Sequence, residues 1–379
     1  MMFRDNSRRM NADTKADVAR LRLNAICPYF TMFPLEMPVR HLQGLPPGSW
    51  ALDPFCGRGT TNFAARLLGL RSVGVDSSPV AAAIAEAKTL TVDPERVVLL
   101  TQRLLSALSE ERPPEGEFWD LAYERRTLQG LLQLRRSLLN DCGSAERKAL
   151  RAIVLGSLHG PRNKGMPGYF SNQMPRTFAP KPRYAISYWR RHELTPPIVN
   201  IEDLVRRKAK YYFQTVPTFQ DSVILCSDSR TVDLAGLRVR CDRVVTSPPY
   251  YGMRTYVPDQ WLRYWFVGGP ANVEYSREDQ LAHGSPETFA AQLSDVWQKA
   301  AAVASSGAKF VVRFGGIKDR AVDPRGLLEE SFRKCGSMFR LQAVKSAGSS
   351  VSGKRQADQF KRSLTNPIEE FDFHYKVLN

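Results

Sequence analysis

The stretch that decides the fold runs from Trp50 to Gly69 and reads WALDPFCGRGTTNFAARLLG. An apolar run that can form a strand ends at Asp53, a loop with Gly57 and Gly59 follows, and an alanine- and leucine-rich run typical of a helix comes next. A second strand-like run, RSVGVD, ends at Asp76 and leads into an alanine-rich helix. Strand, loop, helix and strand in this order open a doubly wound α/β sheet.

Further strand-like runs predict the rest of that sheet. They are SVILC before Asp228, RCDRVVT before Ser247, the segment Ala308–Gly316 and runs within 339–378. Between the two sets of strands, 92–156 has helical periodicity, 159–192 is rich in proline and predicts loops outside the core, and 200–214 predicts a helix. We therefore expect a Rossmann-like sheet with a mostly helical and loop insertion. The expected ranges are 1–104 for the cofactor-binding half, 105–215 for the insertion and 216–379 for the catalytic half.

The loop after the first strand predicts a site for a nucleoside cofactor. Gly57 and Gly59 permit a tight turn and close approach of a ligand. Asp76 ends the next strand, 23 residues after Asp53, where a carboxylate can accept hydrogen bonds from ribose hydroxyls. The third glycine of the dinucleotide fingerprint is absent, because Thr60, Thr61 and Asn62 follow Gly59. This favours S-adenosylmethionine over NAD.

Composition points to an anionic partner and to a reducing compartment. The net charge is +16, and 147–210 alone carries 14 basic and 3 acidic residues, a net of +11. Such an excess is typical of proteins that bind nucleic acid. The six cysteines form no CxxC pair, the five histidines show no ligand spacing, and no run is long and apolar enough for a membrane span. We expect a cytoplasmic protein without a metal site.

The second informative stretch is Thr246–Tyr250, TSPPY, at the end of a predicted strand. Two consecutive prolines lack backbone N–H groups and have a fixed φ, so they end the strand and hold its terminal groups in one arrangement. The Ser247 hydroxyl oxygen and the Pro248 carbonyl could accept both hydrogens of an exocyclic amine, which directs the nitrogen lone pair outward. Tyr250 could stack on a base after it leaves the duplex.

In combination, DPFCGRGTT with GVD and TSPPY resembles the S-adenosylmethionine-dependent DNA amino-methyltransferases, and most of all their cytosine-N4-specific branch among bacterial DNA modification methylases. The resemblance implies catalytic roles for Ser247, Pro248, Pro249 and Tyr250. It also implies that the segment PYFTMFPLEMP, residues 28–38, contacts the methionine end of the cofactor. The cofactor-binding residues that it implies are Tyr29, Phe30, Thr31, Asp53, Phe55, Gly57, Gly59, Thr60, Asp76 and Asp228. Asp76 would bind the ribose and Asp228 the adenine amino group.

Recognition of DNA is expected in the basic, aromatic stretch 159–192, with a second basic segment at 353–362. Lys and Arg there would neutralise phosphates, and amide side chains could read base edges. The expected contacts are Arg162, Lys164, Asn172, Gln173, Arg176, Lys181, Arg183, Lys354 and Arg355.

The motifs, the charge and the resemblance together predict methyl transfer to cytosine N4 in duplex DNA with a flipped target base. A cognate restriction endonuclease or defence system is a compatible partner, and association with a prokaryotic nucleoid is expected. Adenine-N6 DNA methylation and guanine-N2 RNA methylation remain alternatives, as does an inactive nucleic-acid-binding subunit. A covalent cytosine-C5 mechanism is disfavoured, because its nucleophile is a Cys after a Pro and this chain has no such pair.

Overall fold

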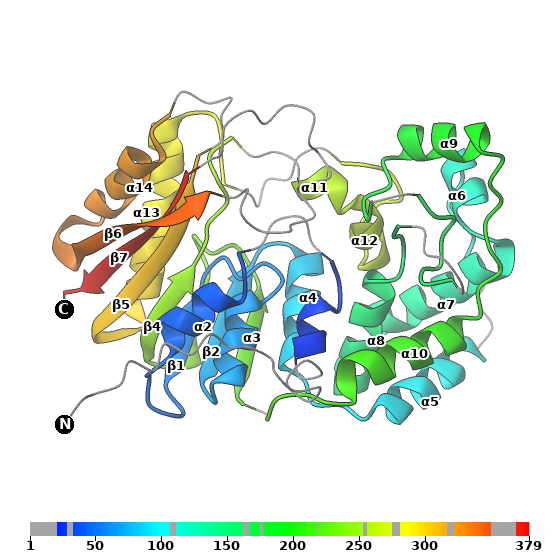
Figure 1. The fold of residues 1–379 in the computed structure, drawn as a ribbon, viewed down its shortest axis with the longest axis horizontal. Coiled ribbons are helices and arrows are strands. Elements are labelled where there is room, and N and C mark those ends of the chain that lie inside the picture. The colour runs from blue at the N-terminus through cyan, green and yellow to red at the C-terminus, as the bar shows by residue number, and fades with distance from the viewer. Residues whose placement is uncertain are drawn as a thin grey trace.

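Among the described residues, seven strands form one sheet in the order β3-β2-β1-β4-β5-β7-β6 (Figure 1). The computed structural model describes residues 21–28, 33–106, 111–161, 167–174, 177–218, 220–252, 256–274, 281–316, 322–349 and 369–378. The strands are β1 Trp50–Asp53, β2 Arg71–Asp76, β3 Ser222–Cys226, β4 Cys241–Thr246, β5 Ala304–Gly315, β6 Phe339–Ser349 and β7 Glu369–Val377. Strands β1 to β5 pair in parallel, and β7 runs antiparallel between β5 and β6. The predicted Rossmann-like doubly wound sheet is confirmed.

The helices in chain order are α2 Glu36–Leu42, α3 Thr60–Leu67, α4 Pro79–Thr89, α5 Pro94–Leu105, α6 Glu117–Ala122, α7 Arg125–Asn140, α8 Ala145–Leu155, α9 Pro182–Arg191, α10 Ile201–Phe213, α11 Tyr256–Asp259, α12 Trp261–Phe266, α13 Pro286–Ala302 and α14 Pro324–Arg333, with 3-10 turns at Arg22–Ala25, Ala235–Leu237 and Gly336–Met338.

Four of these α-helices begin with one signal, a Ser or Asp cap followed by proline at the first helical position: α4, α5, α13 and α14. Each cap oxygen accepts a backbone N–H of the first turn, which stabilises the helix by about 1 kcal/mol.

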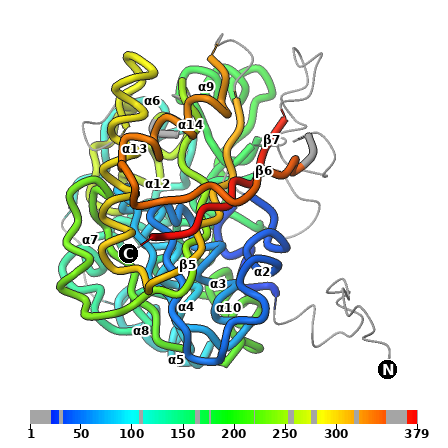
Figure 2. Tube along the Cα trace, turned by 90° about the vertical axis from the view of Figure 1, so that its left-hand side faces the viewer, coloured from blue at the N-terminus to red at the C-terminus, as the bar shows by residue number. Residues whose placement is uncertain are grey.

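Alternation along the strands explains how the two faces of the sheet are covered. Ala51 and Val245 pack with α2 and α3 on one face, whereas Leu52 and Val244 pack with α13 on the other. Figure 2 shows α13 and α14 on one side of β5 and β7, with α2 on the opposite side. Because side chains of a strand alternate between faces, a run of apolar residues in β4 supplies both cores.

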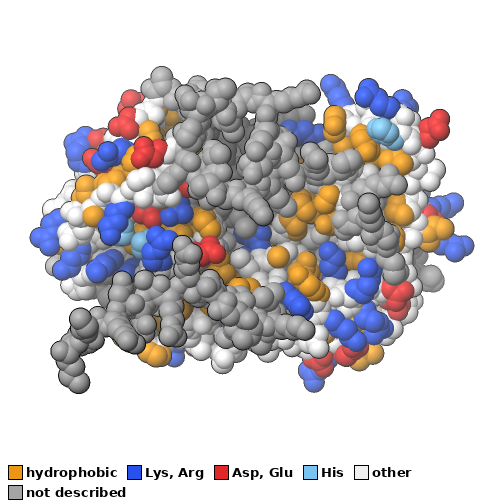
Figure 3. Space-filling model, viewed as in Figure 1, with side chains coloured by type: hydrophobic (Ala, Val, Ile, Leu, Met, Phe, Trp, Pro, Cys, Tyr) orange, Lys and Arg blue, Asp and Glu red, His pale blue; other side chains and the backbone are white. Residues whose placement is uncertain are grey.

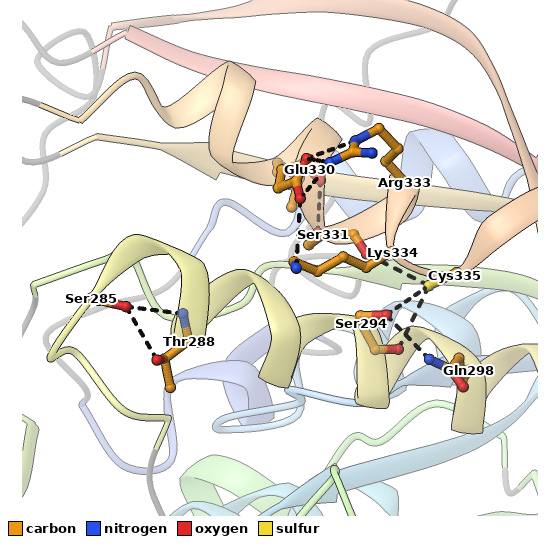
Figure 4. Close-up of polar contacts among 10 residues, drawn as sticks. Ser285, Thr288, Ser294, Gln298, Glu330, Ser331, Arg333, Lys334 and Cys335 are labelled. Carbon is orange, nitrogen blue, oxygen red and sulfur yellow. Dashed lines mark hydrogen bonds and ion pairs between the residues drawn. The ribbon is translucent and has the colours of Figure 1, made fainter.

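Helices α13 and α14 form one layer through polar as well as apolar contacts (Figure 4). The Ser294 hydroxyl lies 3.3 Å from the Cys335 sulfur, and the Trp297 indole donates to the Ser331 hydroxyl at 2.9 Å. At the start of α13, the Ser285 hydroxyl accepts the backbone N–H of Thr288. These contacts hold the helix layer that backs β4 and β5.

A helical lobe lies beside the sheet and is built from α5 to α10 together with α12 (Figure 1). Its centre is an aromatic cluster in which Trp119 contacts both Trp261 and Trp265, and Phe118 contacts Trp189. Helix α12 comes from the chain after TSPPY, so the range 216–379, predicted as the catalytic half, contributes core residues to the helical lobe.

The expectation that 159–192 lies outside the core is wrong for part of the segment. Residues 182–191 form α9, and Tyr169, Phe170 and Trp189 are buried in the helical lobe. The proline-rich composition concealed this, because the anchoring aromatics are separated by turns rather than placed at one helical or strand period.

Arg66 links the two segments by which the chain leaves the sheet and returns to it. Its buried guanidinium donates to the carbonyls of Lys88, Leu90 and Pro217 at 2.9, 2.7 and 2.8 Å. The chain therefore departs near Leu90 and comes back near Pro217. Helix α5 falls almost wholly within 1–104, the range predicted for the cofactor-binding half. In the structure it packs against α10 in the helical lobe.

Candidate functional site

The glycine loop after β1 is anchored to the end of β2. The backbone N–H of Gly57 donates to Asp76 Oδ2 at 3.0 Å, and the N–H of Ser78 donates to Oδ1 at 2.8 Å. Asp76 is half-buried at the predicted strand end. Each carboxylate oxygen can accept a further hydrogen bond. Asp76 therefore shapes the loop and can still accept ribose hydroxyls.

Gly59 does two things in this loop. It caps α3 with a φ of 71°, in the left-handed region that favours glycine. A Cβ built there would lie 2.8 Å from the Cα of Ala85 in α4. The absence of a side chain at Gly59 thus permits the close approach of the loop to α4. At Gly57, φ is 52° and a Cβ would meet no described residue within 4 Å.

Asp53 is the most deeply buried carboxyl of the loop, with no exposed surface. Its Oδ1 accepts the Phe55 N–H at 3.1 Å and the Thr246 hydroxyl at 2.6 Å. Its Oδ2 is buried and has no hydrogen-bond partner among the described residues. Burial raises the pKa of Asp53 to about 6, and the hydroxyls of Thr246 and Thr61 lower it in part. The Thr61 hydroxyl donates its hydrogen to the Val245 carbonyl at 3.2 Å, so it does not fill the place at Oδ2. A buried carboxylate oxygen without a partner is costly, which indicates that a ligand donor belongs there.

Asp228 follows β3 as expected, but its carboxylate pairs with Arg230. The guanidinium Nε lies 2.9 Å from both oxygens, and the backbone N–H of Arg230 also donates to Oδ1. Burial acts to raise the pKa of Asp228, but the hydrogen bonds from Arg230 outweigh it and lower the pKa. Asp228 is therefore oriented by Arg230, a contact that the sequence did not predict.

The TSPPY motif begins at Thr246, the last residue of β4, and β4 pairs with β1. Pro248 is buried, and Ser247, Pro249 and Tyr250 are half-buried. The sheet order reverses at β1 and β4, and ligands of such sheets bind outside the carboxyl ends of the strands at this switch point. The Thr246–Asp53 hydrogen bond joins the two predicted half-sites across it.

Two other cofactor-loop residues serve mainly in packing. Phe55 contacts Trp297 edge to face, with ring centroids 6.1 Å apart, and Thr60 is buried at the start of α3. The thiol of Cys56 is buried, and this burial raises its pKa well above the ordinary value. A protonated, enclosed thiol is a poor nucleophile, in line with the disfavoured C5 mechanism.

The predicted DNA contacts fall into three groups. Lys181 and Arg183 are exposed at the start of α9, where Lys181 also lies 3.6 Å from Asp259. Figure 3 shows Lys and Arg side chains gathered at the α9 end of the molecule. Gln173 is half-buried. The remaining DNA candidates other than Asn172, and the softer cofactor candidates, lie outside the described residues: Arg162, Lys164, Arg176, Lys354, Arg355, Tyr29, Phe30 and Thr31.

The prediction that Asn172 contacts DNA is wrong. Its side chain is buried, and its amide donates to the carbonyls of Leu121 and Leu194 at 3.1 and 3.0 Å. An amide that satisfies two buried carbonyls holds the chain together and cannot also read a base edge.

Sequence reasoning missed Glu370, which lies on β7. The hydroxyl of Tyr250 donates to Glu370 Oε1 at 2.9 Å, and Glu370 is only 8% exposed. The sequence pattern of an alternating strand does not show that one of its glutamates accepts a hydrogen bond from Tyr250. Within the described ranges, no group of three His, Cys, Asp or Glu is arranged to hold a metal. No helix of the described part of the chain is long and apolar enough to cross a membrane.

Comparisons with known proteins agree with the geometry of the cofactor half. A family model described as DNA methylase matches residues 5–87, which include the glycine loop and Asp76. No curated protein matches the chain.

Solved structures with a similar fold include TrmN from Thermus thermophilus, with 12% identity over 95% of this chain and a TM-score of 0.37. This chain spans about half of TrmN, 53% of its length. The rRNA methyltransferase AviRa from Streptomyces viridochromogenes has 11% identity over 99% of this chain and 96% of its own, with a TM-score of 0.34. An rRNA methylase from Streptococcus thermophilus has 8% identity over 93% of this chain and all of its own, with a TM-score of 0.32. Likeness at this level carries no information on the substrate.

The family match over residues 5–87 and the geometry of the site together support a nucleic-acid methyltransferase. The residues present fit S-adenosylmethionine, the methyl donor that the sequence favours. The Asp53 Oδ2 atom offers an acceptor for an ammonium group, no described residue lies within 4 Å of a Cβ built at Gly57, and Asp76 ends the second strand. These cofactor-site residues do not determine which base accepts the methyl group.

Proposed function

We propose that this protein transfers a methyl group from S-adenosylmethionine to the exocyclic N4 amine of cytosine in duplex DNA. The observation that carries the proposal is the 2.6 Å hydrogen bond from Thr246 to Asp53. It sets the strand end that bears TSPPY against the strand end that bears the glycine loop. A cofactor on that loop and an amine on TSPPY would therefore lie side by side.

In the cofactor half, each acidic residue has a distinct task. Asp53 Oδ2, buried and unpartnered, would accept the methionine ammonium, and Asp76 would accept ribose hydroxyls while holding Gly57. Asp228, oriented by Arg230, would accept the adenine amino group. When bound, the cofactor supplies an electrophilic methyl group on a sulfonium.

In the catalytic half, the chain prepares the amine. The lone pair of an exocyclic amine is delocalised into the base, so the amine is a weak nucleophile. Hydrogen bonds to the Ser247 hydroxyl oxygen and the Pro248 carbonyl would favour a pyramidal nitrogen with its lone pair directed outward. The two prolines fix these acceptors, and holding the reactants in attack geometry supplies much of the rate enhancement.

The helical lobe supports duplex DNA as the substrate. The segment 147–210 has a net charge of +11, and the exposed Lys181 and Arg183 lie at its α9 end. Such side chains can neutralise phosphates while the base is drawn toward Tyr250. The predicted insertion 105–215 would then serve target recognition. A cognate restriction endonuclease or defence system is the partner expected for such an enzyme.

The test incubates the full chain with plasmid DNA and labelled cofactor, followed by nucleoside mass spectrometry. We expect N4-methylcytosine, and Ser247→Ala should lose turnover while it keeps cofactor affinity. N6-methyladenine would replace the proposed base, because the TSPPY pocket suits either amine. Label on tRNA alone would redirect the proposal to RNA. Binding of DNA without any methyl transfer would favour an inactive binding subunit.

A further inference from the structure

Among the described residues, Glu370 and Phe314 both contact the side chain of Tyr250. Its hydroxyl donates to Glu370 Oε1 at 2.9 Å, and its ring packs edge to face against Phe314, with centroids 5.5 Å apart and an interplanar angle of 79°. One contact fixes the far end of the side chain and the other fixes its edge. The ring plane is therefore set before any base arrives.

The strand pattern of β7 explains why a glutamate reaches this position. Glu370, Asp372 and His374 share one face of the strand, whereas Phe371 and Phe373 face the other way. On the polar face, Asp372 pairs with Arg313 of β5 through two bonds of 2.8 and 2.9 Å. Arg313 donates to Asp372, and among the described residues the hydroxyl of Tyr250 donates to Glu370.

Gly315 supplies the space for this contact. It lies opposite Glu370 in the antiparallel pairing. A Cβ at Gly315 would come within 3.2 Å of Glu370 Cγ and 3.4 Å of Tyr250 Cε2. The tyrosine and the glutamate can therefore meet over this position because it carries no side chain.

From this geometry we infer that Glu370 is a positioning residue for Tyr250, which sets the ring plane on which the extruded target base stacks. The inference rests on the proposed base-methylating function. A stacking surface needs only an aromatic ring, so the hydroxyl of Tyr250 is not required for stacking itself. A buried carboxylate that accepts this hydroxyl restricts ring rotation, and restricted groups lose less entropy when the ligand binds.

The experiment is a double-mutant cycle on Tyr250→Phe and Glu370→Ala, with Glu370→Gln as the conservative variant. Glu369→Gln is the matched control, because Glu369 is exposed on the same strand. Three readouts are taken for each variant: kcat and KM on duplex DNA, fluorescence of 2-aminopurine at the target position, and the free energy of unfolding. Cofactor affinity by calorimetry checks that the glycine loop is intact.

We expect Tyr250→Phe and Glu370→Ala each to lower kcat roughly tenfold, the loss of one hydrogen bond to a charged group. The double variant should be no worse than either single one, since both remove the same bond. Glu370→Gln keeps an acceptor oxygen and should restore most of the rate. Both single variants should reduce the 2-aminopurine signal, and Glu369→Gln should match the wild type.

Additive losses in the cycle would overturn the inference, as would a Glu370→Ala variant with wild-type kcat. A variant that loses cofactor affinity together with kcat would show a merely structural role and would equally overturn it. If the wild type methylates no nucleic acid, the proposed function fails. The unfolding cycle then decides the Tyr250–Glu370 contact separately, and zero coupling there would refute it.

Discussion

The hydroxyl of Thr246 donates a 2.6 Å hydrogen bond to Oδ1 of Asp53, which joins the end of β4 to the end of β1 at the switch point of the sheet. The two residues belong to separate motifs, 193 positions apart in the chain. The bond favours the ionised form of a fully buried carboxyl and orients it, so that Oδ2 is left for a ligand.

Cofactor affinity is predicted to fall below about pH 6. Burial raises the pKa of Asp53 from 3.8 to about 6, so the carboxyl takes up a proton as the pH falls through that value. The neutral acid would no longer attract an ammonium group, and affinity should drop about tenfold per pH unit when one proton is coupled to binding. Calorimetry from pH 5 to pH 8 measures the profile.

Thr246→Val supplies the control for this titration. The hydrogen bond from Thr246 lowers the pKa of Asp53, so the valine variant should move the midpoint to higher pH. Thr246→Ser keeps the donor and should keep the profile. A flat profile in the wild type would contradict the assignment of Asp53.

Asp76→Ala is predicted to weaken cofactor binding by one to two orders of magnitude. This factor corresponds to the loss of one hydrogen bond from a ribose hydroxyl to a charged group, worth roughly 1.5–3 kcal/mol, while release of the Gly57 N–H acts on the loop itself. Asp76→Asn retains one acceptor oxygen and should lose less. Equal affinity in the alanine variant and the wild type, measured by calorimetry, would exclude Asp76 from the cofactor site.

Asp372→Ala is predicted to reduce the free energy of unfolding by about 3–5 kcal/mol, because it leaves Arg313 buried without its partner. Burial acts to raise the pKa of Asp372, but His41 and Arg313 outweigh it and lower the pKa. A lowered pKa means that this stability is present above pH 3.8 and is lost as the pH falls further. Urea unfolding at pH 7 and pH 3 measures both effects, and the variant should respond less to acid than the wild type.

Lys181→Ala with Arg183→Ala is predicted to weaken DNA binding without changing cofactor affinity. Each phosphate contact that is lost should reduce the slope of log affinity against log salt by about 0.9, hence by about 1.8 for the pair. Lys376→Ala on β7, far along the chain from α9, is the charge-matched control for one lysine. An unchanged slope in the double variant would remove α9 from the DNA interface.

Local signals allowed much of the fold to be predicted. The run from Trp50 to Asp76 predicted strand, loop, helix and strand, and the structure has β1, α3 and β2 there. Residues that serve distant partners were less accessible. Asn172 has the side chain of a base reader, yet it bonds the carbonyls of Leu121 and Leu194 because the helical lobe folds around it.

By itself, the sequence determined the sheet and the place of the glycine loop and the paired prolines at strand ends, because strand alternation, glycine turns and paired prolines act over a few neighbouring residues. Only the tertiary structure decided which loops meet and what supports them. Tyr250 and Glu370 are 120 positions apart, and Trp261 of the predicted catalytic range packs into the core of the helical lobe. Such contacts depend on how whole elements pack, and no local pattern carries that information.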